Sequence, residues 1–170
     1  MFNCTKRSSD RGFTLTELLV AIIILGILSA VGTPNLLGKI SHFRVQSSIY
    51  QLEGAIKESQ RQAKRLGQMC RVNIQPETNS IEGSPTQCLL GDRLINKDVI
   101  IRTNLSGNPP NISFSYLGNT TKMGTIVLSS NYTNTQKCFV IALGTGISRI
   151  GDYTGNNVGS VLAANCITSN

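Results

Sequence analysis

Residues 12–38 read GFTLTELLVAIIILGILSAVGTPNLLG, an apolar run with a single glutamate near its start. The 25 residues from Phe13 to Leu37 exceed the roughly 20 that a membrane-spanning helix needs. Three basic residues, Lys6, Arg7 and Arg11, precede the run. Because positive charge stays on the cytoplasmic side, the segment is expected to insert with its N-terminus inside the cell and its C-terminal end outside.

Glu17 sets this segment apart from an ordinary membrane anchor. An ionised carboxylate is unfavourable inside a bilayer and needs a partner there. A plain single-pass anchor therefore explains neither Glu17 nor the glycine before Phe13. A cleaved secretory signal is a second alternative, but such a signal ends in small residues of the A-x-A kind, and no such site bounds this run.

The stretch from Gly12 to Val20, continued through to Pro34, closely resembles the N-terminus of type IV pilins and of the pseudopilins of type II secretion. The resemblance implies that a membrane peptidase, the prepilin peptidase, cuts after Gly12 and that Phe13 is then N-methylated. It also implies that Glu17 of one subunit neutralises the N-terminus of a neighbour in the assembled fibre. Removing either charge would leave the other buried and unpaired, which is strongly destabilising.

The expected organisation has three parts: a cleaved leader (1–12), a transmembrane or fibre-core half of a long helix (13–38), and an exported head (39–170). Pro34 lacks an N–H group and clashes with the carbonyl four residues earlier, so a kink is expected near it. Without the leader the chain retains 13 basic and 8 acidic residues, a net charge of +5. The mature protein is therefore only mildly basic.

Beyond the apolar run, hydrophobic residues recur at helical spacing, namely Val45, Ile49, Leu52, Ile56, Ala63 and Leu66. This spacing predicts an amphipathic helix. Lys64 and Arg65 suit a helix C-terminus, and Gly67 permits the left-handed residue that commonly follows one. One long helix is therefore expected from Phe13 to about Leu66.

The rest of the chain alternates short apolar stretches with turn residues, a pattern typical of β-strands. The expected strands are Cys70–Ile74, Thr86–Leu90, Val99–Arg102, Ile112–Tyr116, Thr125–Ser129, Lys137–Leu143 and Ile147–Ile150. The predicted fold class is α+β, with a long N-terminal helix packed on a small antiparallel β-sheet head. The first half of the helix is transmembrane and the second half amphipathic.

Three stretches of the head are similar to the GspH/FimT group of minor pilins: residues 55–67, 112–118 and 139–146. This resemblance implies a minor pilin or pseudopilin that joins other pilin or pseudopilin subunits at an inner-membrane assembly platform. The chain would lie in the inner membrane with its head outside, and then in a type IV pilus or a type II secretion pseudopilus.

Cysteine usage indicates an oxidising compartment. Cys4 lies in the leader, and Cys70, Cys88, Cys138 and Cys166 leave an even number for two disulfides. Four cysteines allow three connectivities. We favour Cys70–Cys88, which would tie adjacent strands across one turn, and Cys138–Cys166, which would hold the C-terminal tail. The chain has no close C-x₂-C pair, so neither a metal site nor a cofactor is expected.

The residues do not suggest an enzyme. The only histidine is His42, expected where the helix leaves the membrane surface, and the acidic residues are too scattered to form a catalytic pair. The alternative to a purely structural role is DNA binding for DNA uptake. Members of the FimT group that take up DNA carry Gly-Arg-x-Arg, whereas this chain reads Gly146-Ile147-Ser148-Arg149. Arg149 and Lys137 are the candidate phosphate-binding residues, and we expect weak binding that falls steeply with salt.

Overall fold

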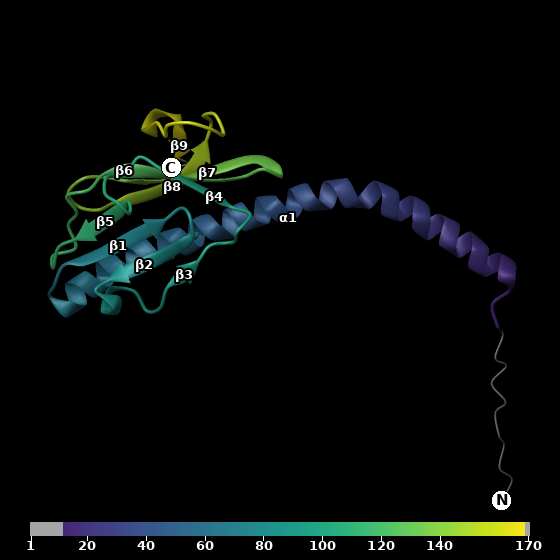
Figure 1. The fold of residues 1–170 in the computed structure, drawn as a ribbon, viewed down its shortest axis with the longest axis horizontal. Helices are drawn as coiled ribbons and strands as arrows, with labels where there is room; N and C mark the ends of the chain where they lie inside the picture. The colour runs from purple at the N-terminus through teal and green to yellow at the C-terminus, as the bar shows by residue number, and fades with distance from the viewer. Residues whose placement is uncertain (1–11, 169–170) are drawn as a thin grey trace, which may run out of the picture. The chain divides into compact units, whose positions relative to one another are not determined.

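The structure is a computed structural model that describes residues 12–168, apart from the side chains of residues 30–35. Its longest element is the helix α1 (Leu15–Leu66), which agrees with the helix expected from the sequence (Figure 1). The chain divides into two units, Met1–Leu36 and Leu37–Asn170. Pro34 lies within α1, among the residues whose side chains the structure does not describe. The kink expected there stays a prediction.

The head, residues 37–168, contains two antiparallel sheets. The first has the strand order β3-β2-β1-β5 and the second the order β4-β6-β7-β8-β9. The strands of the first sheet are β1 (Cys70–Gln75), β2 (Ser80–Ser84), β3 (Arg93–Leu94) and β5 (Asn111–Phe114). Those of the second sheet are β4 (Ile100–Thr103), β6 (Gly124–Ser130), β7 (Thr133–Ile141), β8 (Ser148–Tyr153) and β9 (Cys166–Thr168).

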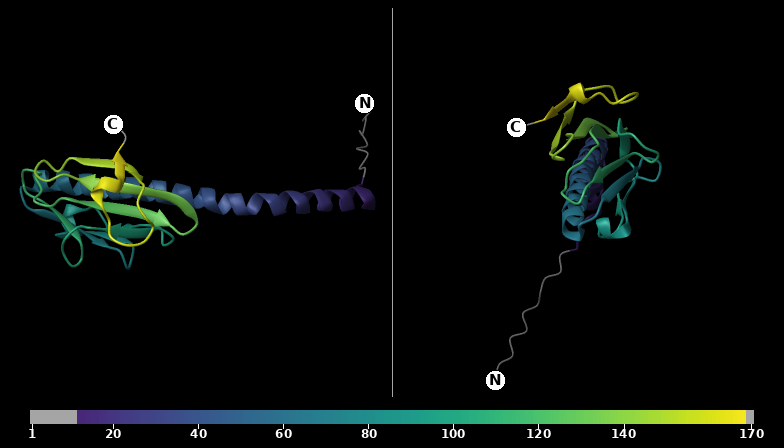
Figure 2. Two further views of the ribbon diagram at one scale, coloured as in Figure 1. Left: turned by 90° about the horizontal axis from the view of Figure 1, so that it is seen from above. Right: turned by 90° about the vertical axis from the view of Figure 1, so that its left-hand side faces the viewer.

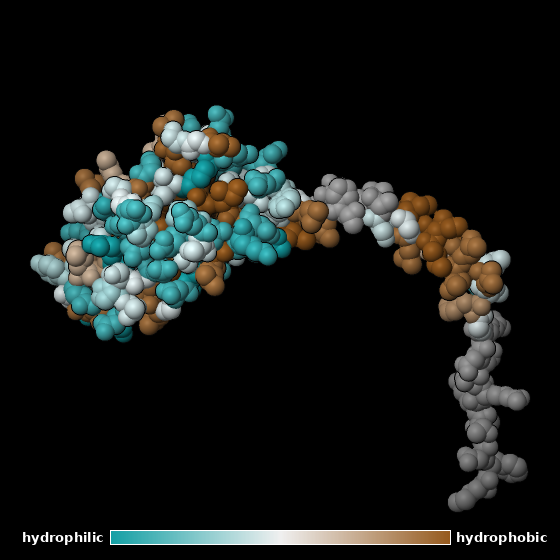
Figure 3. Space-filling model, viewed as in Figure 1, coloured by the Kyte–Doolittle hydropathy of each residue, from teal (hydrophilic) through white to brown (hydrophobic). Residues whose placement is uncertain are grey.

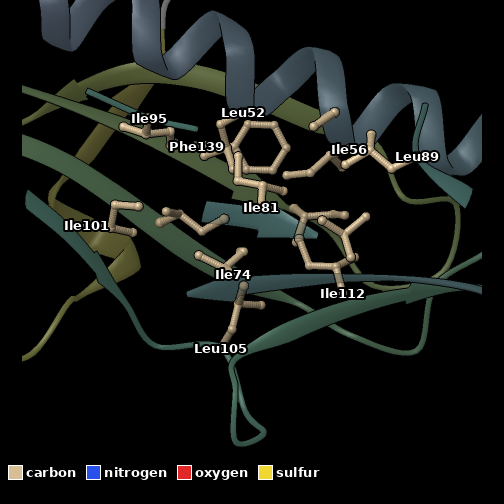
Figure 4. Close-up of a cluster of buried hydrophobic side chains, with 14 of the residues drawn as sticks. Leu52, Ile56, Ile74, Ile81, Leu89, Ile95, Ile101, Leu105, Ile112 and Phe139 are labelled. Atoms are coloured by element: carbon tan, nitrogen blue, oxygen red, sulfur yellow. The ribbon is translucent and has the colours of Figure 1, made fainter. Parts of the chain in front are cut away.

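A single hydrophobic core joins the second half of α1 to the inner faces of both sheets. In Figure 4, Leu52 and Ile56 of α1 point towards Ile81 of the first sheet and Phe139 of the second. The helical stripe predicted from the sequence is buried from Val45 to Ala63, whereas Leu66 at the helix end is about one-third exposed. The two views of Figure 2 show the second half of α1 running along the sheets of the head.

The α+β class is confirmed, but the head contains two sheets where a single sheet was expected. The expected strand Thr86–Leu90 is wrong. Its first three residues form a 3-10 helix, η1 (Thr86–Cys88), because the Cys88 N–H donates to the carbonyl of Pro85 at 2.9 Å and closes a turn. Strands β2, β3 and β9 lie where the sequence pattern did not predict strands.

The C-terminal end of α1 is tied to the loops that precede β6 and β8. Gln60 donates from Nε2 to the carbonyl oxygens of Gly118, at 2.8 Å, and Thr145, at 3.2 Å. The helix ends at Leu66, and Gly67 follows it with a φ of 63°, the left-handed conformation expected there. One amide side chain therefore fixes two loops that are far apart in the sequence.

Gly151 of β8 lies directly against β9. A Cβ at this position would meet backbone atoms of Ile167 and Thr168, which cannot move without displacing the strand. We expect Gly151→Ala to lower the free energy of unfolding by about 2 kcal/mol or more. Gly54→Ala is the matched control: nothing lies within 4 Å of that Cβ, and alanine in a helix interior stabilises by about 0.5–1 kcal/mol. Denaturation of the full chain in detergent, followed by circular dichroism, measures both, and equal stability of the two variants would contradict the prediction.

Candidate functional site

The start of α1 is a capping box formed by Thr14 and Glu17. The Thr14 backbone N–H donates to Glu17 Oε2 at 3.0 Å, and the Glu17 backbone N–H donates to Thr14 Oγ1 at 3.3 Å. The Thr14 hydroxyl also donates to Glu17 Oε2, at 3.0 Å. These bonds satisfy donors that a helix start otherwise leaves unpaired, and they place a carboxylate at the positive end of the helix dipole.

The carboxylate opens onto an apolar surface of the helix. Thr16, Glu17, Val20, Ala21 and Ile24 line a shallow groove of about 370 Å³ along one face of α1. Nine large hydrophobic residues between Leu18 and Leu28 are each 52–64% exposed, so the first half of α1 is apolar and uncovered in the isolated chain. Figure 3 shows one face of this apolar stretch. A helix that is hydrophobic all round is normally surrounded by other apolar groups.

Among the residues that the structure describes, no helix combines the length and the mean hydropathy of a membrane-spanning segment.

The bond between Gly12 and Phe13 lies just before the helix, in backbone without regular secondary structure. Both residues are exposed, Phe13 to 87%, and nothing within 4 Å would obstruct a Cβ at Gly12. The fold of this chain therefore does not itself require glycine at residue 12. Any requirement for glycine at residue 12 therefore comes from another molecule that binds this segment.

The structure does not bring the two candidate DNA-binding residues together. Lys137 Nζ forms an ion pair with Asp152 Oδ1 at 2.6 Å, and the Lys137 side chain is only 17% exposed. Arg149 is exposed on β8, opposite Val140 of β7. Because residues 137 and 140 are an odd number of positions apart on one strand, Lys137 and Arg149 lie on opposite faces of the sheet.

The four cysteines of the head form two disulfides, Cys70–Cys88 and Cys138–Cys166, with Cα–Cα distances of 5.4 and 5.9 Å. This is the connectivity favoured in the sequence analysis. His42 lies on α1 and its Nδ1 is 2.9 Å from the hydroxyl of Thr135 on β7. Within residues 12–168, no group of three or more histidine, cysteine, aspartate or glutamate residues is placed to hold a metal ion.

The roles of two side chains, Thr14 and Glu58, were not predicted from the sequence. Thr14 stands three residues before Glu17, and the pattern T-x-x-E at the start of an apolar helix is a recognised capping-box signal that would have identified it. Glu58 accepts bonds from the Leu90 N–H at 2.9 Å and from Arg93 Nη2 at 2.8 Å. It lies more than 30 residues away from both, so no local pattern predicts these contacts.

Comparison with known proteins finds a family model that matches the N-terminus and a relative that matches part of the chain. Residues 7–33 match the family model described as the prokaryotic N-terminal methylation motif. The chain is 46% identical over 54 residues to the type II secretion system core protein G of Klebsiella michiganensis, which covers 30% of this chain. The aligned part spans only 38% of that relative's length.

The fold is similar to those of two solved structures. One is the type IV minor pilin FimU of Pseudomonas aeruginosa, with a TM-score of 0.52 and 10% identity over 65% of this chain and 89% of that chain. The other is the minor pseudopilin EpsH of the type 2 secretion system of Vibrio cholerae, with a TM-score of 0.47 and 15% identity over 66% of this chain and 96% of that chain. At this level of identity, the likeness to FimU shows a shared fold.

Proposed function

Since the chain belongs to the family of type IV pilins and pseudopilins, we propose that it is a minor pilin or pseudopilin of the GspH/FimT group. Prepilin peptidase removes residues 1–12, and Phe13 is then methylated. The mature subunit is held in the inner membrane before assembly, with residues 13–38, which include the first half of α1, in the bilayer and the head (39–170) outside. The assembly platform then transfers it, with other subunits, into a type IV pilus or a type II secretion pseudopilus.

The observation that carries this proposal is the position of Glu17. Its carboxylate lies four residues after the expected new N-terminus and opens onto an apolar groove of α1. A carboxylate in apolar surroundings needs a cation, and a neighbour's Phe13 ammonium supplies one when helices stack side by side. The apolar circumference of α1 supports such stacking, because it offers a hydrophobic contact surface on every side.

The role is assembly rather than catalysis. Glu17 acts by pairing, and the exposed apolar helix acts by packing against its neighbours, so neither needs a bound substrate. DNA binding for uptake stays a prediction that no observation favours. The ion pair with Asp152 occupies Lys137, and a single cation at Arg149 gives little of the phosphate neutralisation on which DNA affinity depends.

Analysis of the mature N-terminus tests the proposal. We expect mass spectrometry of the membrane-extracted protein to find a chain that begins at a methylated Phe13. Gly12→Val should leave the leader in place, whereas Gly26→Ala, a glycine in the same apolar run with nothing within 4 Å of its Cβ, should be processed like the unchanged chain. A mature protein that retains Met1 or begins near Ala30 would overturn the proposal.

A further inference from the structure

The end of the head where α1 enters it carries a small, largely apolar hollow of about 300 Å³. The residues that line this hollow are Leu37, Ile40, Ser41, Arg44, Asp98 and Tyr132. Leu37 is 61% exposed and Tyr132 is 62% exposed. Asp98, the acidic residue of this lining, forms an ion pair with Arg44. Exposed apolar side chains that share one hollow and have a polar rim are typical of sites that contact a protein or a membrane.

Tyr132 is held close to the start of the head. It lies in the turn between β6 and β7, which Figure 1 shows beside α1. The carbonyl oxygen of Tyr132 is 3.7 Å from the position that a Cβ would take at Gly38. His42 of α1 and Thr135 of β7 are joined by a hydrogen bond of 2.9 Å, which fixes this turn against the helix. Tyr132 therefore stays near residue 38 for any orientation of the preceding segment.

Two lysines and a phenylalanine adjoin the hollow. Lys39 and Lys97 are exposed and precede Ile40 and Asp98 of its lining. In the part of the chain that the structure describes, neither lysine forms an ion pair or a side-chain hydrogen bond. Phe43, which is 68% exposed, lies one turn after Lys39 on the same face of α1. We call these residues the base surface: Leu37, Lys39, Ile40, Phe43, Lys97 and Tyr132.

The base surface contains the residue types that a membrane–water interface favours. A tyrosine can place its ring among apolar groups and keep its hydroxyl in water, so tyrosines are enriched at this interface. A lysine can lay its methylene stem along apolar groups and hold its ammonium group among lipid phosphates. Apolar side chains such as Phe43 and Leu37 gain by entering the boundary between headgroups and acyl chains.

We propose that the base surface seats the head on the phospholipid headgroup layer of the membrane. Tyr132 and Phe43 lie at the boundary with the acyl chains, and the two lysines contact lipid phosphates. The inference rests on the proposed function, in which residues 13–38 lie in the bilayer. The base surface begins at the outer end of that segment. Because it includes two turns besides the helix, the seat holds the head in one orientation before assembly, which a flexible tether would not do.

The position of the base surface in the chain favours lipid over a protein partner. Residue 38 cannot leave the membrane surface while the preceding segment is inserted, so headgroups surround the base surface before assembly. The charges agree with this occupant. Lys39 and Lys97 are unpaired, and the one carboxylate among the residues that line the hollow is already neutralised by Arg44. The base surface therefore complements the negative charge of lipid phosphates.

Lipid quenching of a single tryptophan tests the seat, because the chain itself has none. The full chain is reconstituted in vesicles of phosphatidylethanolamine and phosphatidylglycerol that contain a lipid brominated near its headgroup. We expect the bromines to lower the emission of Tyr132→Trp about twofold, since the ring lies at the interface. The matched control is Tyr116→Trp, which should not be quenched.

Tyr116 suits this comparison by its exposure and its place. It is 59% exposed, close to the value for Tyr132. It lies two residues before Gly118, where a Cβ would meet the side chain of Lys64 in the last turn of α1. At 1.5 Å per residue, Lys64 is about 39 Å along the helix from residue 38. The two tryptophans therefore report on opposite ends of the head.

Charge reversal tests the contact with lipid phosphates. Lys39→Glu together with Lys97→Glu, in the Tyr132→Trp chain, should abolish most of the quenching. High salt should act in the same direction on the chain with both lysines, because it screens exposed charges. Lys64→Glu together with Arg71→Glu makes an equal charge change at the other end of the head and should leave the quenching unchanged. Quenching that neither the lysine changes nor salt reduces would contradict the proposed lipid contact.

Three further results would overturn the proposal. The first is a chain that floats with the vesicles while Tyr132→Trp is quenched no more than Tyr116→Trp, which would leave the proposed function standing. The second is a chain that does not float with the vesicles, since the proposed membrane stage then fails as well. The third is a Tyr132→Trp emission that shifts to shorter wavelength in assembled fibres but is not quenched in vesicles, which would make the base surface a contact with another subunit.

Discussion

Glu17→Ala is expected to leave the chain in the membrane and to lower its incorporation into fibres by roughly a hundredfold. In the proposed assembly the carboxylate pairs with a neighbour's N-terminus, and removal of one member of a buried ion pair leaves the other charge without a partner. Glu17→Gln should fall in between, because the amide keeps a hydrogen-bonding group and loses the charge. Quantitative immunoblotting of sheared fibres and of membranes measures the two pools separately.

Thr14→Ala separates pairing between subunits from capping within one subunit. This variant removes the hydroxyl partner of the capping box and keeps the carboxylate of Glu17. Loss of an N-cap weakens the helix start by about 1 kcal/mol. If Glu17 acts by pairing with a neighbour, Thr14→Ala should keep most of the incorporation. Equal losses in Thr14→Ala and Glu17→Ala would mean that the capping box, and not the pairing, is what assembly requires.

Removal of the Cys70–Cys88 disulfide should produce the largest loss of stability in the head. Closing a loop with a sequence separation of 18 contributes about 3 kcal/mol in the chain-entropy model, and both cysteines are fully buried in the main core. Folded domains have only about 5–15 kcal/mol of net stability. We expect Cys70→Ser with Cys88→Ser to make the full chain in detergent sensitive to pulse proteolysis at much lower urea.

The second disulfide and the leader cysteine provide the comparison. The Cys138–Cys166 bond closes a longer loop, with a sequence separation of 28, so its chain-entropy contribution is slightly larger. Cys138→Ser with Cys166→Ser should nevertheless have a smaller effect, because this pair lies in the minor cluster and Cys166 is only partly buried, so less packing is lost. Cys4→Ser changes a residue of the expected leader and should not alter the mature protein. If the Cys70/Cys88 double variant resisted pulse proteolysis as well as the unchanged chain, packing alone would be sufficient to stabilise this part of the head.

The helix could be predicted from the sequence because its signals are local. The helix α1 is described almost to its ends by a long apolar run, then a stripe at steps of three and four, and then Gly67. The same kind of signal marks Thr14 and Glu17 as a capping box, although only Glu17 was singled out. Signals of this kind depend on residues within a few positions of each other, so the fold of the head does not obscure them.

The arrangement of the head depends on contacts that the sequence does not display. Alternation assigns a residue to a face of a strand but does not name the neighbouring strand, so one expected sheet became two. Strand β2 was missed because Gly83 interrupts its pattern, and the Cβ of any other residue there would meet Leu89. Lys137 and Arg149 looked like one basic site until the register of β7 and β8 placed them on opposite faces.

Both disulfides join cysteines that follow one another in the chain: Cys70 with Cys88, then Cys138 with Cys166. The two loops neither overlap nor enclose each other. A head that leaves the membrane with residue 39 first therefore presents Cys70 with its correct partner before Cys138 emerges. Oxidation in the order of emergence gives the native pairs without any bond having to be broken again. For a subunit exported as we propose, an oxidant outside the cytoplasm is therefore expected to form the native pairs without an isomerase to reshuffle wrong ones.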